Sequence, residues 1–153
     1  MADVNLTQQD WEIRLHVYDV IVATGQAPSY PDIAQHFAIP DKDARQALHR
    51  LNDGHALFLR PESDDILMAH PLSAIDADYE VMVDGITLYA NCAWDSLGIP
   101  AMLHKDARIT MKHPLTRETI SYAVKDSQLL TDEGGYVHFA LPFIRWYDDL
   151  IDT

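Results

Sequence analysis

Cysteine is almost missing from this sequence, which contains only Cys92 among 153 residues. A single cysteine cannot form an intrachain disulfide, so the hydrophobic core has to hold the fold together. A chain of this length with 48% hydrophobic residues is large enough to bury such a core without cross-links. Because no apolar signal segment opens the sequence, this cysteine usage is typical of a reducing compartment, and we expect a cytoplasmic protein.

Long hydrophobic runs are missing as well. The longest ones, such as "VYDVIVATG", contain charged residues and are far too short to span a bilayer. We therefore predict no membrane-spanning segment.

Basic residues are scarce: 11 lysines and arginines face 24 aspartates and glutamates, which gives a net charge of −13. Residues 1–70 alone carry 5 basic and 11 acidic residues. Affinity for nucleic acids depends mainly on lysine and arginine contacts to phosphates, and anionic membranes attract the same side chains. The charge therefore argues against nucleic-acid and membrane partners.

Helical periodicity predicts three helices in the N-terminal half, at residues 7–24, 32–37 and 41–53. Thr7 is the expected N-cap of the first, because its hydroxyl can accept a hydrogen bond from a free backbone N–H. The apolar stripe of this helix is predicted to consist of Trp11, Leu15, Tyr18 and Val22, widened by Ile13, Val17, Val20 and Ile21. The third helix is predicted to bury Ala44, Ala47, Leu48 and Leu51.

The stretch "HALFLR-PESDD-ILMAHP" predicts a β-hairpin, since two apolar runs flank a polar turn that contains proline. Three helices and a hairpin, in this order, predict a winged-helix-like lobe over residues 1–70. Such a lobe either binds DNA with its third helix or serves only as a scaffold, and the acidic charge favours the scaffold. The polar residues that the third helix would expose are Lys42, Arg45, Gln46, His49 and Arg50.

Residues 70–76 read as a linker, and residues 77–153 are predicted to form a second lobe that is rich in β-structure. Two strands flank a tight turn at Asp84-Gly85, and a hairpin over 107–124 turns at His113-Pro114. A helix that starts near Asn91 and is interrupted around residues 98–100 carries Cys92. The stretch "GGYVHFALP" predicts a further strand, and "PFIRWYDDLIDT" predicts a last helix. The predicted fold class is α+β, with a mostly antiparallel sheet on which the cysteine-bearing helix packs.

Cys92 and Asp95 are the candidate functional residues. If Asn91 caps the helix, Cys92 lies in its first turn, where the positive end of the helix dipole favours a thiolate. Asp95, three residues later, lies on the same face and can exchange protons with the sulfur. Trp94 is expected to pack in the core. A thiolate beside a carboxylate suits a soft metal, whereas the commoner role of a lone cysteine is that of a small buried core residue.

Other catalytic signals are weak. None of the eight histidines is spaced as a metal-binding pair, and neither a glycine-rich phosphate loop nor a nucleophile elbow is present. The sequence therefore indicates no resident cofactor, and it carries no signal for an oligomeric state.

Two segments resemble the organomercurial (alkylmercury) lyase family. "ITLYANCAWDSLGIPAML" resembles the family's active-site segment, in which an aromatic strand leads into a helix with Cys-x-x-Asp, and "GGYVHFALP" resembles a later strand with a His-x-Phe pattern. The order of a helical lobe, the cysteine helix, hairpins and the His-Phe strand also agrees. The resemblance is tight around Cys92 and loose over most of the chain.

The resemblance implies that two cysteines and one aspartate carry the reaction, with Cys92 as the first cysteine and Asp95 as the proton shuttle. The second cysteine is expected just before the His-x-Phe strand, where this sequence has Gly135 or a neighbouring residue. The chain is thus expected to be a short or degenerate member of the family, or a fragment of a longer one. An external thiol would have to replace the second cysteine.

The expected function is therefore that of an alkylmercury-lyase-like protein. Cys92 would bind a soft metal or an organomercurial, which is substrate or ligand rather than cofactor, and the protein would either cleave carbon–mercury bonds weakly or act on another small substrate. Two alternatives remain: a non-catalytic winged-helix regulator, and a thiol-sensing module in which Cys92 reacts with oxidants or electrophiles.

Overall fold

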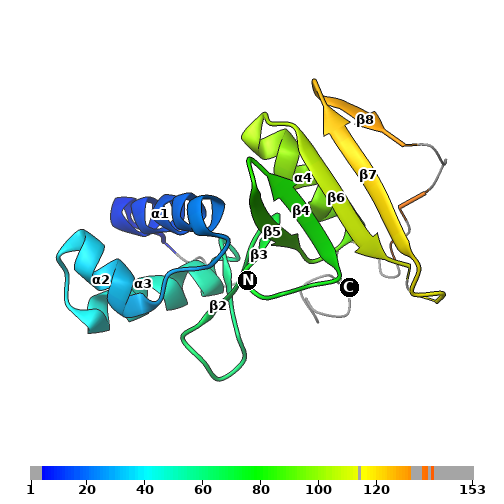
Figure 1. The fold of residues 1–153 in the computed structure, drawn as a ribbon. Coiled ribbons are helices and arrows are strands. Elements are labelled where there is room, and N and C mark those ends of the chain that lie inside the picture. The colour runs from blue at the N-terminus through cyan, green and yellow to red at the C-terminus, as the bar shows by residue number, and fades with distance from the viewer. Residues whose placement is uncertain (1–4, 114, 132–135, 138, 140–153) are drawn as a thin grey trace.

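The computed structural model describes residues 5–113, 115–131, 136–137 and 139. Within them, four helices and an eight-stranded antiparallel sheet make up an α+β fold, as predicted. The three N-terminal helices gather on one side, and α4 lies against the sheet (Figure 1). The sheet order is β1-β2-β3-β5-β4-β6-β7-β8.

Helix α1 (Gln8–Thr24) begins at the predicted N-cap, Thr7. The Thr7 hydroxyl accepts from the backbone N–H of Asp10, and the Asp10 carboxylate accepts from the backbone N–H of Thr7, which forms a capping box. The buried face consists of Asp10, Ile13, Val17 and Ile21.

The prediction for the apolar stripe of α1 was partly wrong, because Trp11 and Leu15 are 44% and 60% exposed. Apolar residues occupy two adjacent stripes of this helix, and both fit helical spacing. The stripe that carries Ile13 and Val17 is the one that faces the core.

Helix α2 (Tyr30–Phe37) begins two residues before its predicted start, with Ser29 as the N-cap. Helix α3 (Asp41–Asp53) has its predicted bounds, and the four residues predicted to face inward are all buried. Strands β1 (Phe58–Leu59) and β2 (Ile66–Ala69) form the predicted antiparallel hairpin. The winged-helix assignment of this part stays a prediction.

Residues 70–76, which read as a linker in the sequence, include a short strand. This is β3 (Leu72–Ser73), whose two residues are both buried. Strand β3 pairs with β2 on one side and with β5 on the other, so the sheet continues from β1 to β8. The division into lobes at 1–70 and 77–153 stays a prediction.

The central strands follow the sequence pattern closely. Strands β4 (Tyr79–Val83) and β5 (Ile86–Ala90) flank Asp84 and Gly85, whose φ values of 51° and 83° are those of a tight hairpin turn. Strands β6 (Ala107–Lys112) and β7 (Thr119–Lys125) form the second predicted hairpin. Strand β8 (Gln128–Leu130) was not predicted. The predicted strand over 134–142 lies largely, and the predicted last helix entirely, outside the described residues.

Helix α4 (Ala93–Leu103) packs on the sheet through Ile99, which is fully buried. It continues through Gly98–Pro100, where an interruption was predicted. A proline inside a helix removes one hydrogen bond. Here both Ile99 and Pro100 are buried, and this packing offsets that loss.

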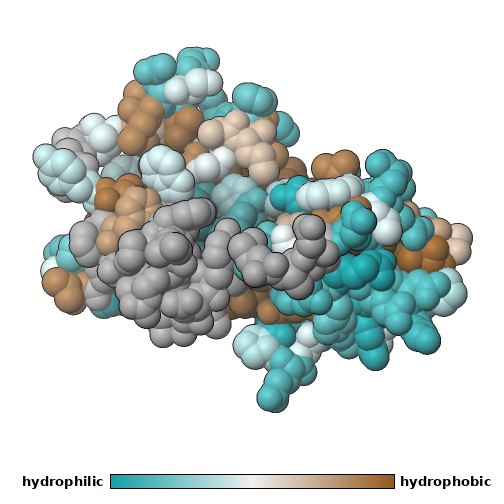
Figure 2. All heavy atoms as spheres, turned by 180° about the vertical axis from the view of Figure 1, so that it is seen from behind, coloured by the Kyte–Doolittle hydropathy of each residue, from teal (hydrophilic) through white to brown (hydrophobic). Residues whose placement is uncertain are grey.

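A single large cluster of buried apolar side chains joins the helices to the sheet. The surface in Figure 2 shows apolar residues in separate groups among hydrophilic ones. Among the described residues, none of the helices combines the length and the apolar character needed to cross a membrane.

Candidate functional site

Cys92 lies where β5 meets α4, and its sulfur caps the helix. The backbone N–H of Asp95 donates to Cys92 Sγ at 3.5 Å, and Cys92 has the extended backbone of an N-cap residue, with φ −146°. The predicted cap was Asn91, one residue earlier. The sulfur therefore lies at the helix end itself, where it accepts a hydrogen bond from a backbone N–H that has no partner within the helix.

The thiol and the carboxyl of this helix end interact directly. The spacing of three residues puts the Cys92 thiol and the Asp95 carboxyl on one face of the helix, where each shifts the pKa of the other. Cys92 is partly exposed, and the Asp95 side chain is 15% exposed. Cys92 is thus partly open to solvent, while most of the Asp95 side chain is buried.

Trp94 is 57% exposed and does not pack in the core as predicted. The side of α4 that faces the sheet carries Ser96, Ile99 and Pro100, so Trp94 projects from another side. Its ring meets Phe139 edge to face, with 6.1 Å between the ring centroids. This contact places one residue of the predicted strand over 134–142, Phe139, beside the start of the cysteine helix.

His70, for which the sequence suggested no role, lies next to the candidate pair. Its Nδ1 is 3.9 Å from Asp95 Oδ2, and its side chain is 40% exposed. His70 lies between β2 and β3, far from Asp95 in the sequence. No local spacing could have revealed this proximity, because it depends on the order of the strands.

Helix α1 fixes the backbone at His70. The Tyr18 hydroxyl donates to the His70 carbonyl oxygen at 2.7 Å, and Arg14 Nη2 donates to the Tyr18 oxygen at 2.8 Å. Arg14 Nε also donates to the carbonyl of Ala56 at 2.8 Å. On its other side, the His70 ring meets Phe58 edge to face at 5.4 Å.

Burial dominates the protonation of Asp95 and His70. It raises the pKa of Asp95 above its ordinary value of 3.8, although the nearby His70 and the Cys92 side chain act in the opposite direction. Burial likewise lowers the pKa of His70 below 6.5, while the charge of Asp95 opposes this shift. Asp95 is therefore a stronger base and a more available proton donor than an exposed aspartate.

The pKa of Cys92 is raised above 9.0, first by burial and then by the charge of Asp95. Hydrogen bonds from the backbone N–H groups of Asp95 and Trp94 act to lower it, but they are outweighed. The helix end thus acts in favour of the thiolate, as expected, but burial and the charge of Asp95 outweigh it. At neutral pH the sulfur is a thiol, and it needs a base to become a nucleophile or a metal ligand.

The three groups thus lie in a row, from the Cys92 thiol through the Asp95 carboxyl to the His70 imidazole. Such a row can take a proton from the sulfur and return it to a bound molecule. In the part of the chain that the structure describes, no group of three or more histidine, cysteine, aspartate or glutamate side chains is arranged to hold a metal ion. The soft donor that a ligand would meet at this site is the sulfur of Cys92.

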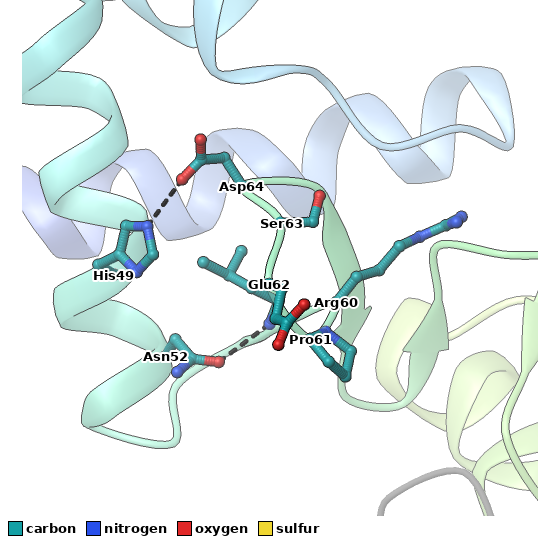
Figure 3. Close-up of a pocket in the computed structure, with 8 residues that line it drawn as sticks. His49, Asn52, Arg60, Pro61, Glu62, Ser63 and Asp64 are labelled. Atoms are coloured by element: carbon teal, nitrogen blue, oxygen red, sulfur yellow. Dashed lines mark hydrogen bonds and ion pairs between the residues drawn. The ribbon is translucent and has the colours of Figure 1, made fainter.

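An open cavity of about 430 Å³ lies elsewhere, between α3 and the turn of the β1–β2 hairpin (Figure 3). His49 Nε2 contacts Asp64 Oδ1 across it at 2.7 Å, and the Asn52 side-chain oxygen accepts from the backbone N–H of Leu59 at 3.0 Å. Its lining residues are His49, Asn52, Leu59, Arg60, Pro61, Glu62, Ser63 and Asp64. Neither Cys92 nor Asp95 lines this cavity.

Three of the basic residues that a DNA-binding α3 would present, Arg45, His49 and Arg50, contact carboxylates within the protein. Arg45 Nε is 2.9 Å from Asp64 Oδ2, and His49 contacts the other oxygen of the same carboxylate. Arg50 forms two hydrogen bonds with the buried Asp10, at 3.1 and 2.7 Å.

Comparison with known proteins points to one family. Residues 72–146 match the family model described as "Alkylmercury lyase". The crystal structure of the mercury-bound form of MerB2 shares the fold with a TM-score of 0.66 and 24% sequence identity over 83% of this chain. The chain spans 61% of the length of that protein. No curated protein sequence matches the chain.

Proposed function

Because the chain belongs, through residues 72–146, to the alkylmercury lyase family, we propose that it binds an organomercurial at Cys92 and protonates the carbon–mercury bond with Asp95. The observation that supports this proposal most is the Cys92–Asp95 pair at the start of α4. A partly exposed cysteine and a largely buried carboxyl are the two groups that the reaction needs.

In the first step, Asp95 takes the proton of the Cys92 thiol, and the sulfur bonds to the mercury of R–Hg–X while X⁻ leaves. The raised pKa of Asp95 helps here, because a more basic carboxylate accepts the thiol proton more readily. Mercury is the substrate's own metal, and thiolate sulfur is its preferred ligand among protein side chains.

In the second step, the Asp95 carboxyl gives this proton to the carbon, the carbon–mercury bond breaks, and R–H leaves. The mercury stays on the Cys92 sulfur and takes X⁻ or an external thiolate as its second ligand. The net change converts Cys–SH and R–Hg–X into Cys–S–Hg–X and R–H. Exchange with an external thiol R′–SH restores the Cys92 thiol and releases R′S–Hg–X.

The need for an external thiol follows from the composition of the chain. Mercury(II) favours two soft ligands, and Cys92 is the only cysteine in the 153 residues. We infer that a small thiol acts as co-substrate, supplying the second sulfur during bond cleavage and removing the mercury afterwards.

The test is to incubate the protein with phenylmercury acetate and an excess of a small thiol, and to measure benzene by gas chromatography. We expect benzene from the wild-type protein and only the uncatalysed background from Cys92→Ser and Asp95→Asn. The Asp95→Asn variant should still bind phenylmercury one to one by mass spectrometry, because its thiol is intact. The absence of benzene from the wild-type protein would overturn the proposal.

Two other functions are less well supported. A DNA-binding regulator would need free cations on α3, yet Arg45 and Arg50 are engaged by carboxylates of the protein itself. A thiol sensor would need a readily ionised sulfur, whereas burial raises the pKa of Cys92. Tight, salt-dependent binding to duplex DNA would support the regulator. Fast oxidation of Cys92 by peroxide would support the thiol sensor.

A further inference from the structure

We propose that His70 is a positioning residue for the same site: its imidazole holds the Asp95 carboxyl toward Cys92, and so prepares the delivery of the proton to the substrate carbon. This inference rests on the function proposed above. His70 reaches the reaction only through Asp95, and it does not touch the organomercurial.

The first argument is the geometry of the His70–Asp95 contact. Nδ1 of His70 lies 3.9 Å from Asp95 Oδ2, which is within ion-pair range but longer than a hydrogen bond. Contacts of this kind are commonly long in the absence of substrate and shorten when it binds. Asp95 therefore has Cys92 on one side and an imidazole on the other, and a carboxyl held from both sides has little freedom to turn away.

The second argument is the packing of the His70 turn on α4. Asp95 and Gly98 lie three residues apart and therefore on the same face of the helix. A Cβ atom added at Gly98 would lie only 3.3 Å from Cβ of Pro71, so the glycine allows the turn to rest directly on the helix. With Pro71 against Gly98, the preceding residue is placed beside Asp95.

The third argument is the support that His70 receives from α1. The hydrogen bond from Tyr18 holds the His70 carbonyl, and Arg14 holds the Tyr18 hydroxyl in turn. Tyr18 is largely buried, and burial raises the pKa of its phenol, so this hydroxyl stays protonated and remains a donor. Phe58 limits the rotation of the imidazole from the other side.

This arrangement predicts a specific kinetic effect. Binding of the mercury depends on the Cys92 sulfur, whereas proton delivery depends on where the Asp95 carboxyl points. Loss of the imidazole should therefore lower kcat and leave KM unchanged, because only the interaction needed for the chemical step is weakened.

The test compares His70→Leu with His70→Asn in the benzene-release assay. The amide nitrogen of asparagine can occupy the position of Nδ1 and donate to Asp95, whereas leucine cannot. We expect kcat of His70→Leu to fall by about tenfold with KM unchanged, and His70→Asn to recover most of the rate. Tyr18→Phe, which removes the hydrogen bond to the His70 carbonyl together with the one that Tyr18 accepts from Arg14, should lower kcat by a smaller factor.

His49→Leu is the matched control. It also removes a histidine that contacts an aspartate, at 2.7 Å from Asp64, but in the cavity beside α3 rather than at the thiol. Its kcat should equal that of the wild-type protein. Equal losses in His70→Leu and His70→Asn, a wild-type kcat in His70→Leu, or a raised KM as the main effect would each overturn the proposal.

A second measurement does not depend on catalysis. Titration of the His70 ring by NMR should give a lower pKa in Asp95→Asn than in the wild-type protein, because the carboxylate that favours the imidazolium is removed. An unchanged pKa would overturn the proposed contact even in an active protein. A wild-type protein that releases no benzene but shows this coupling would overturn the proposed function and leave the His70–Asp95 interaction established.

Discussion

The Asp95 side chain, the proposed proton donor, is buried at the expense of stability. Burial raises its pKa, which means that the folded protein disfavours the charged carboxylate relative to the unfolded chain. The stability associated with Asp95 is fully present below its unfolded pKa of about 3.8 and is lost as the pH rises through its folded pKa. At neutral pH the fold therefore carries a cost that asparagine would not impose.

We accordingly expect Asp95→Asn to raise the free energy of unfolding at neutral pH while it abolishes benzene release. Urea denaturation of the two proteins should show a difference that shrinks as the pH falls toward the unfolded pKa, since the wild-type carboxyl then becomes neutral as well. An Asp95→Asn protein that is less stable than the wild type at neutral pH would contradict this account of the site.

His16 and His36 form a second sensitive pair, where α1 meets α2. Their rings stack at 3.7 Å, and the pKa of His16 lies below 6.5, because of burial first and the charge of His36 second; Asp19 opposes the shift. Stability from a histidine with a lowered pKa is present above its unfolded value and is lost as the pH falls through 6.5 toward the folded pKa.

We expect His16→Phe, which keeps an aromatic ring on the stack, to lose less unfolding free energy than the wild type between about pH 7 and pH 5. Urea denaturation at both pH values measures this. The pKa of His70 is lowered as well, so His70 also reduces the unfolding free energy as the pH falls. Because His70 is present in both proteins, the difference between them reports on His16. Equal losses in the two proteins would rule out this role of the stack.

At this scale the sequence predicts what is local. Cys92 and Asp95 were recognised because three residues along one helix bring two side chains together. His70 could not be recognised, since its position beside Asp95 depends on β3 pairing with both β2 and β5. The exposure of Trp94 was missed because an aromatic residue next to a predicted site looks like a core residue until the orientation of the helix is known.

At the scale of elements, helix ends and tight turns were the most predictable features, since each depends on a few adjacent residues. The Thr7 cap and the Asp84-Gly85 turn were found in this way. Strand β3 was missed because two residues show no periodicity. The continuation of α4 past Pro100 was missed because local preference argues for a break, whereas burial against the sheet overrides it.

Asp10 links two elements, since it caps α1 and also binds Arg50 of α3 from a fully buried position. Burial acts to raise its pKa, but hydrogen bonds from Arg50 and Thr7 hold it below 3.8. We expect Asp10→Ala to lower the unfolding free energy by about 2 kcal/mol, because it removes hydrogen bonds to a charged group, the Arg50 guanidinium, whose side chain is 39% exposed.

Chemical denaturation measures this loss, and Asp78→Ala provides the control. Asp78 pairs with Arg117 at 2.9 Å, but both side chains are exposed. Removal of the exposed pair should leave the stability nearly unchanged. Equal effects of the two substitutions would show that the α1–α3 pair is no more important than a surface contact.

At the scale of the whole molecule, the missing second thiol is the main departure from what the family resemblance implies. Gly135 is the expected place, and it lies outside the described residues. We expect Gly135→Cys to increase the rate of benzene release and to reduce its dependence on added thiol, because mercury then meets two sulfur ligands in one protein.

Lys125→Cys is the comparison for this experiment, since it adds a thiol at the exposed end of β7. It should leave both the rate and the thiol dependence unchanged. A Gly135→Cys protein that folds normally and releases benzene no faster than Lys125→Cys would show that the second sulfur position has been assigned wrongly.

The hydrogen bond from Tyr18 to the His70 carbonyl joins the first helix of the chain to the proposed proton-transfer row of Cys92, Asp95 and His70. A shortened protein that began at residue 77 would keep the thiol and its carboxyl neighbour, but it would lose the imidazole and the tyrosine behind it. Trimming the helices away would therefore not produce a minimal enzyme. The N-terminal helices would then be needed because they fix the residues that position the Asp95 carboxyl, whether or not these helices bind DNA.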